Sequence, residues 1–155
     1  MIIRFNKELT YEFEMANFPL FVGSTGLYFI FLKTLLIPYP FKKSHLAYIG
    51  MSESRLNSIG KRLKDHLSGR SNNRGIIGYC KNWELAFTYL DCEFLKYIFT
   101  AKNIEAIESY FLEDFSNEFG TYPICNNRRG PLEQSPCSQH GVKIQWDFFG
   151  GRNDR

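Results

Sequence analysis

The chain has 155 residues, enough for one hydrophobic core but with little room for a second full domain, so we expect 1–155 to form a single domain. Apolar residues make up 44% of it and charged residues 23%, which are ordinary values for a soluble globular protein. The net charge of +3 permits binding to a polyanion without arguing for it.

Neither a secretory signal nor a membrane span is expected. The first fifteen residues are charged throughout and lack the apolar stretch of a signal peptide. The longest apolar run, residues 26–37, is interrupted by Lys33 and is too short to cross a bilayer. We therefore expect a cytoplasmic protein whose cysteines are reduced thiols.

The first half of the chain predicts two paired strands. Residues 1–22 alternate charged and aromatic positions and predict a short helix or strand added to the core. Residues 26–36 (GLYFIFLKTLL) predict a buried strand, and residues 45–52 (HLAYIGMS) predict a second one. The loop 38–44 between them, with two prolines and two lysines, makes this a hairpin with a long connection.

A helix is predicted next, over residues 54–67. Its apolar stripe at helical spacing consists of Leu56, Ile59, Leu63 and Leu67. Gly69 is a suitable stop, and residues 69–75 (GRSNNRG) predict a basic polar loop.

The second half predicts a strand and a long helix. Residues 83–90 predict a third strand, and residues 95–100 favour a strand because they are aromatic and β-branched. Residues 103–117 predict an amphipathic helix, and the remainder from Cys125 is expected to be mostly loop. This order predicts an α+β fold, a small and mostly antiparallel sheet of three or four strands flanked by helices.

The four cysteines show no metal-binding pattern of the usual kind. Cys80, Cys92, Cys125 and Cys137 are irregularly spaced and form no CxxC pair. Cys137 and His140 have ligand-like spacing, but a zinc site needs four ligands and usually two such pairs. Buried or incidental cysteines are the plainer interpretation.

Glu108 is the most informative position for chemistry. On the helix predicted over 103–117 it lies inside the apolar stripe, one turn after Ile104 and one turn before Phe111 and Leu112. A buried carboxylate costs several kcal/mol unless it is paired or bound to a metal. A metal or catalytic role and a structural ion pair both remain open from spacing alone.

Arg62 and His66 are a second signal, because residues four apart share one helix face. An arginine matches phosphate oxygens bidentately, and a histidine can exchange a proton near neutral pH. The alternative is a solvated helix edge. Tyr28 and Tyr48, taken alone, are ordinary strand tyrosines.

Taken in order, these pieces resemble the GIY-YIG nuclease family. The resemblance covers about residues 24–130, which leaves residues 1–23 and 131–155 as N-terminal and C-terminal extensions. The matching pieces are Gly26-Leu27-Tyr28, Tyr48-Ile49-Gly50, Arg62 followed by His66, Glu108 on a helix, and Pro123-Ile124-Cys125-Asn126 as the final Pro-x-x-Asn.

Two features depart from the family pattern. Residues 29–47, between the first two motifs, form a longer connection than the usual short loop. Insertions of this kind resemble those of restriction-like or stand-alone members. Met51 stands where some relatives carry a lysine, which leaves open the group that activates the tyrosine.

The resemblance implies a metal-dependent endonuclease that hydrolyses DNA with water as the nucleophile. Glu108 would hold one divalent metal, Mg²⁺ or Mn²⁺, and Arg62 would clamp the scissile phosphate. Tyr28 or Tyr48 would act as general base, and His66 would accept its proton as the imidazole becomes neutral between roughly pH 5.5 and 7.5. Asn126 would orient the site through hydrogen bonds.

The expected partner is double-stranded DNA, with no membrane, and a homodimer is left open. Basic loops would bind the phosphates. The residues expected to do so are Lys42, Lys43, Arg70, Arg74, Arg128 and Arg129. Two alternatives remain: a nuclease-derived module that binds nucleic acid or protein without cutting, and a metal-site or structural protein that uses Cys137 and His140.

Overall fold

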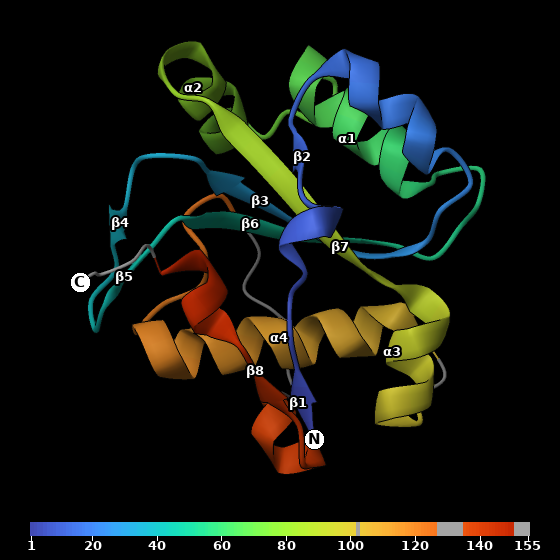
Figure 1. The fold of residues 1–155 in the computed structure, drawn as a ribbon, viewed down its shortest axis with the longest axis vertical. Coiled ribbons are helices and arrows are strands. Elements are labelled where there is room, and N and C mark those ends of the chain that lie inside the picture. The colour runs from blue at the N-terminus through green and yellow to red at the C-terminus, as the bar shows by residue number, and fades with distance from the viewer. Residues whose placement is uncertain (102, 127–134, 151–155) are drawn as a thin grey trace.

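A four-stranded antiparallel sheet lies at the centre of the computed structural model, which describes residues 1–101, 103–126 and 135–150 (Figure 1). Its strand order is β2-β7-β3-β6. The bounds are β2 Tyr11–Glu12, β3 Gly26–Leu32, β6 Leu46–Ser52 and β7 Leu85–Asp91. The predicted α+β class with a small antiparallel sheet is confirmed.

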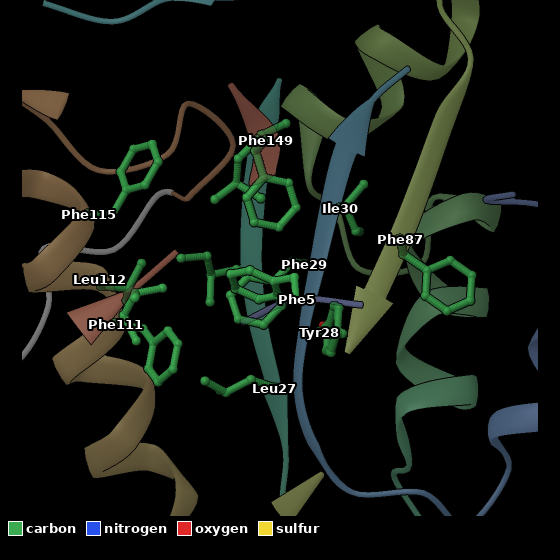
Figure 2. Close-up of a cluster of buried hydrophobic side chains, with 14 of the residues drawn as sticks. Phe5, Leu27, Tyr28, Phe29, Ile30, Phe87, Phe111, Leu112, Phe115 and Phe149 are labelled. Atoms are coloured by element: carbon green, nitrogen blue, oxygen red, sulfur yellow. The ribbon is translucent and has the colours of Figure 1, made fainter. Parts of the chain in front are cut away.

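Helices cover both faces of this sheet. In Figure 1, α1 (Ile59–Ser68) and α2 (Arg74–Asn82) lie above the strands, and α3 (Cys92–Phe99) and α4 (Ile104–Phe119) lie below them. Figure 2 shows how β3 serves both layers: Phe29 points toward Phe111 of α4, whereas Tyr28 points to the opposite side. This alternation is the period of two that an extended strand imposes on its side chains.

The helix predicted over 54–67 begins later than expected. Ser58 caps it by accepting a hydrogen bond from the Lys61 backbone N–H at 3.5 Å, so α1 starts at Ile59. Leu56 therefore lies in the preceding loop with 91% of its surface exposed, and its place in the predicted apolar stripe was wrong.

Two further helices differ from the sequence prediction. Residues 92–99 are helical, because the Asp91 carboxylate accepts hydrogen bonds from the backbone N–H groups of Glu93 and Phe94 and starts a helix there. The strand favoured over 95–100 was therefore wrong. In the predicted basic loop, Asn73 caps a helix that was not predicted, α2, whose two glycines mask its helical character.

The two ends of the described chain meet beneath the sheet. β1 (Ile2–Ile3) pairs in parallel with β8 (Lys143–Ile144), so the expectation of mostly loop after Cys125 was incomplete. Trp146 and Phe149 follow β8 and are buried, and Phe149 packs against Phe29 with ring centroids 6.0 Å apart. The C-terminal segment is thus part of the core below the sheet.

The long connection between β3 and β6 folds into a small hairpin of its own. Its strands are β4 (Ile37–Pro38) and β5 (Lys43–Ser44). The Tyr39 hydroxyl donates to the Leu46 carbonyl at 2.6 Å and accepts from the Ile124 N–H at 2.9 Å, which fastens the hairpin to the segment after α4. Within the described part of the chain, no helix is both long and apolar enough to cross a membrane.

Candidate active site

A phenol, a guanidinium and an imidazole are in direct contact between the sheet and α1. Tyr28 comes from β3, and Arg62 and His66 come from successive turns of α1, which confirms that the two share one helix face. The Tyr28 hydroxyl lies 2.9 Å from His66 Nε2 and accepts a hydrogen bond from Arg62 Nε at 3.3 Å. Tyr28 is 0% exposed and His66 is 4% exposed, so bulk water has little access to this contact.

Tyr48 joins the same cluster from β6. Tyr28 pairs with Gly50 and Ile30 pairs with Tyr48 across the antiparallel ladder, so both tyrosine side chains point to one face. The Tyr48 ring lies edge-on to His66 with centroids 5.0 Å apart, and 6.0 Å from the ring of Tyr28. Unlike Tyr28, Tyr48 is partly exposed.

Gly50 is required by the packing of Tyr28. A Cβ at position 50 would lie 2.3 Å from Tyr28 Cζ, a separation that no real contact tolerates. Glycine is required at position 26 for a similar reason. Its φ is +143°, and a Cβ there would lie 2.1 Å from the Leu90 carbonyl oxygen. The glycines that begin and end the two sequence motifs are thus explained by close packing within the sheet.

Both tyrosines hold their protons firmly in this environment. Burial raises the pKa of Tyr28 well above 10, and burial followed by the negative charge of Glu108 raises the pKa of Tyr48. The positive charge of Arg62 lowers the pKa of both phenols, but less than burial raises it. Neither phenol is therefore a ready base by itself, and each needs a proton acceptor beside it.

His66 is a neutral imidazole. Burial, and then the positive charge of Arg62, lower its pKa to about 4, although Asp65 raises it slightly. This lowered pKa disagrees with the titration between pH 5.5 and 7.5 expected from an unperturbed histidine, because the sequence does not reveal the desolvation. At neutral pH the ring can accept a proton.

Glu108 lies on α4, which packs against β6, and only 5% of its surface is exposed. Its burial follows from its place in the apolar stripe. The negative charge of Glu108 acts on Tyr48, Tyr28 and Arg62, which places the carboxylate within electrostatic reach of the cluster.

The buried carboxylate of Glu108 is an oxygen donor of the kind that hard divalent cations prefer. Among residues 1–101, 103–126 and 135–150, no group of three or more His, Cys, Asp or Glu side chains could hold a metal ion. A cation held at Glu108 would have this one carboxylate as a protein ligand, with water and phosphate oxygens as the others. Mg²⁺ commonly binds in this way.

Asn126 acts on the backbone of β6 rather than on the cluster. Its side-chain oxygen accepts from the Ile49 N–H at 3.0 Å, and its side-chain nitrogen donates to the Ile49 carbonyl at 2.9 Å. β6 is one of the two edge strands of the sheet, and the Asn126 amide supplies hydrogen bonds there that a further strand would otherwise make. Asn126 thereby fixes the backbone next to Tyr48.

Basic residues are concentrated on the segment that forms α1 and α2. Residues 53–82 contain seven Lys or Arg and two Asp or Glu, which gives this segment a charge of +5. Because the whole chain has a net charge of +3, all other residues together carry −2. The weak net charge of the chain therefore conceals a strongly basic segment, which includes the exposed Arg70 and Arg74.

The other predicted DNA contacts differ in their surroundings. Lys42 forms an ion pair with Glu118 and lies over the ring of Phe119, so its charge is already partly neutralised. Lys43 is exposed on β5. Arg128 and Arg129 lie outside the described residues.

A cavity of about 450 Å³ borders Arg62 and His66. Leu56, Lys61 and Ser71 also line it. The Ser71 hydroxyl lies 2.8 Å from His66 Nδ1. No sequence pattern pointed to Ser71, because only the path of the loop after α1 brings the two residues together.

Cys137 and His140 have separate surroundings. Cys137 is 0% exposed, and burial raises the pKa of its thiol. The His140 ring stacks on Tyr110 with centroids 4.0 Å apart, and its Nε2 lies 3.0 Å from the Ser135 hydroxyl. These contacts account for both residues as parts of the packing. All four cysteines are free thiols.

Comparison with known proteins found no counterpart: no family model, no curated protein and no solved structure matches the chain.

Proposed function

We propose that this chain is a nuclease of the GIY-YIG type, which hydrolyses DNA phosphodiester bonds with water as nucleophile and one divalent metal ion at Glu108. One observation carries the proposal: the Tyr28 hydroxyl contacts both a guanidinium and a neutral imidazole. A phosphate-binding cation and a proton acceptor that share one phenol are suited to deprotonating water beside a phosphate.

Burial supports different roles for the two tyrosines. Only a group with access to solvent can take a proton from the attacking water, and Tyr48 is partly exposed whereas Tyr28 is 0% exposed. Tyr48 also interacts with Tyr28. In the proposed relay, water loses its proton to Tyr48, Tyr48 passes one to Tyr28, and Tyr28 passes one to His66 Nε2.

Arg62 would bind the phosphate at the edge of this relay. It borders the cavity beside α1, and its planar donors match phosphate oxygens. The hydroxide formed from water then attacks phosphorus while the bond to the leaving oxygen breaks. A bound Mg²⁺ or Mn²⁺ would stabilise the negative charge on that oxygen.

The basic segment 53–82 supports DNA as the substrate. A concentration of positive charge next to the cluster would attract the phosphate backbone regardless of base sequence. The charge also suits the alternative function, a module that binds nucleic acid without cutting it. The buried Glu108 carboxylate beside the cluster favours the nuclease, because binding alone does not need it.

The decisive experiment is incubation of the purified protein with supercoiled plasmid, with Mg²⁺ and with Mg²⁺ plus excess EDTA. We expect nicked or linear product only without EDTA. The Tyr48→Phe variant keeps the ring and removes the hydroxyl, and we expect it to bind DNA normally and to cut far more slowly. Tight binding without cleavage by the wild type, in either Mg²⁺ or Mn²⁺, would favour the non-cleaving module.

A further inference from the structure

The loop after α1 folds back on the last turn of that helix. Gly69 takes the left-handed conformation, with φ at +85°, and reverses the chain direction. The Ser71 N–H then donates to the Asp65 carbonyl at 3.2 Å. This bond brings the Ser71 hydroxyl to 2.8 Å from His66 Nδ1, the ring nitrogen that does not face Tyr28.

Ser71 is held from its other side by the start of α2. Its hydroxyl oxygen accepts a hydrogen bond from the Asn73 N–H at 3.4 Å. Asn73 is itself fixed, because its side chain caps α2 and also donates to the Cys125 carbonyl at 3.0 Å. The position of the Ser71 hydroxyl is thus set by two helices, although its residue is exposed to solvent.

The surroundings of His66 distinguish its two nitrogens. On the Nε2 side, the Tyr28 oxygen accepts a hydrogen bond from Arg62 Nε. The Tyr28 hydroxyl can therefore donate its own proton to His66 Nε2. The positive charge of Arg62 on that side favours a lone pair over an N–H at Nε2. On the other side, Ser71 offers an oxygen to Nδ1. Both conditions favour the neutral tautomer with its proton on Nδ1.

We propose that Ser71 is a positioning residue, which holds His66 in the tautomer protonated at Nδ1 so that the Nε2 lone pair faces the Tyr28 hydroxyl. The contacts favour this tautomer, whereas its catalytic meaning rests on the proposed function. With the proton on Nε2, His66 would donate to Tyr28 and could not receive its proton. Loss of the Ser71 hydroxyl would therefore reduce the fraction of protein that can deprotonate Tyr28.

The tautomer can be measured without DNA or metal, by ¹⁵N NMR of histidine-labelled protein at pH 7. The chain has three histidines, so the His66 signals are assignable by comparison with His66→Gln. We expect wild type and Ser71→Thr to show a protonated Nδ1 and an unprotonated Nε2. Ser71→Ala should populate the opposite tautomer. A protonated Nε2 in the wild type, or an unchanged tautomer in Ser71→Ala, would overturn the proposal.

Single-turnover plasmid cleavage tests the catalytic consequence. We expect Ser71→Ala to slow cleavage by roughly five- to tenfold, the factor that corresponds to one hydrogen bond, with unchanged DNA affinity. Ser71→Thr should restore the rate, and Ser68→Ala, which removes an exposed hydroxyl from the same end of α1, should leave it unchanged. Wild-type cleavage by Ser71→Ala would refute the positioning role. Absence of cleavage by the wild type would refute the proposed function instead, and the NMR result would still decide the tautomer.

Discussion

Gly50 lies directly across the β3–β6 ladder from Tyr28, and the Tyr28 ring occupies the space that a side chain at position 50 would need. The phenol can reach Arg62 and His66 only because the facing residue has no Cβ. Gly50, the glycine of the second motif, therefore matters because it leaves room for Tyr28, the tyrosine of the first motif.

The first prediction follows from this contact. Gly50→Ala should lower the free energy of unfolding by about 1–3 kcal/mol and strongly reduce cleavage, because Tyr28 is buried and has no room to move aside. Chemical denaturation measures the stability. Gly78→Ala is the matched control: apart from the neighbouring backbone of α2, no atom of the described residues lies within 4 Å of its new Cβ, so stability should stay equal or rise. Equal stability of Gly50→Ala and wild type would contradict the packing argument.

The second prediction concerns the metal site. Glu108→Gln keeps the shape of the side chain and removes its charge, so we expect the same fold and DNA affinity but cleavage reduced by about a thousandfold or more. Glu105→Gln, an exposed position in the first turn of α4, should cut normally. Magnesium titration of the cleavage rate is the measurement. Undiminished cutting by Glu108→Gln would rule out the metal assignment.

A third prediction tests the phosphate clamp. Arg62→Lys keeps the positive charge but loses the planar donors and the bond from Nε to Tyr28, so its rate should fall by about 10²–10³-fold. Lys64→Arg on the exposed side of α1 serves as a control for charge and helix content. If Arg62→Lys cuts at nearly the wild-type rate, Arg62 supplies only general attraction for DNA.

The fourth prediction is a pH profile. Protonated His66 cannot accept a proton, and its pKa is about 4, so the rate should fall only as the pH drops toward that value. Between pH 6 and 7.5, His66 should cause no change in rate. His66→Ala should cut more slowly at every pH and should lack the acidic fall.

Circular dichroism at each pH is needed beside this profile. A histidine whose pKa is lowered by folding makes the folded state less stable as the pH falls from 6.5 toward 4, because the unfolded chain then binds more protons. If the cleavage rate falls with a midpoint near pH 6.5 while the protein is still folded, the imidazole of His66 is not desolvated, contrary to the structure.

The fifth prediction concerns DNA binding. Arg70→Ala and Arg74→Ala should each lower the slope of log affinity against log salt by about 0.9 if each contacts one phosphate. Lys42→Ala should change it less, because Lys42 is already paired with Glu118. Fluorescence anisotropy in EDTA separates binding from cleavage. An equal loss of slope in all three variants would mean that segment 53–82 contributes no more to DNA binding than Lys42 does.

Much of the framework was predictable because short-range patterns determine it. Short apolar runs rich in β-forming residues identified the strands that became β3, β6 and β7, and helical spacing identified α4 and the place of Glu108 in its apolar stripe. The same spacing placed Arg62 and His66 on one face of α1. A helix repeats every 3.6 residues, so the sequence alone determines which of its side chains share a face.

Other features were decided only by tertiary structure. The pairing of Ile2 with Lys143 and the contact of Ser71 with His66 depend on where loops and chain ends travel, and no local repeat encodes that. The helix at 92–99 depends on one cap at Asp91, which outweighed the strand preference of the residues after it. The pKa of His66 depends on how completely the fold excludes water from the ring, because desolvation acts on the group in its final surroundings rather than on its neighbours in sequence.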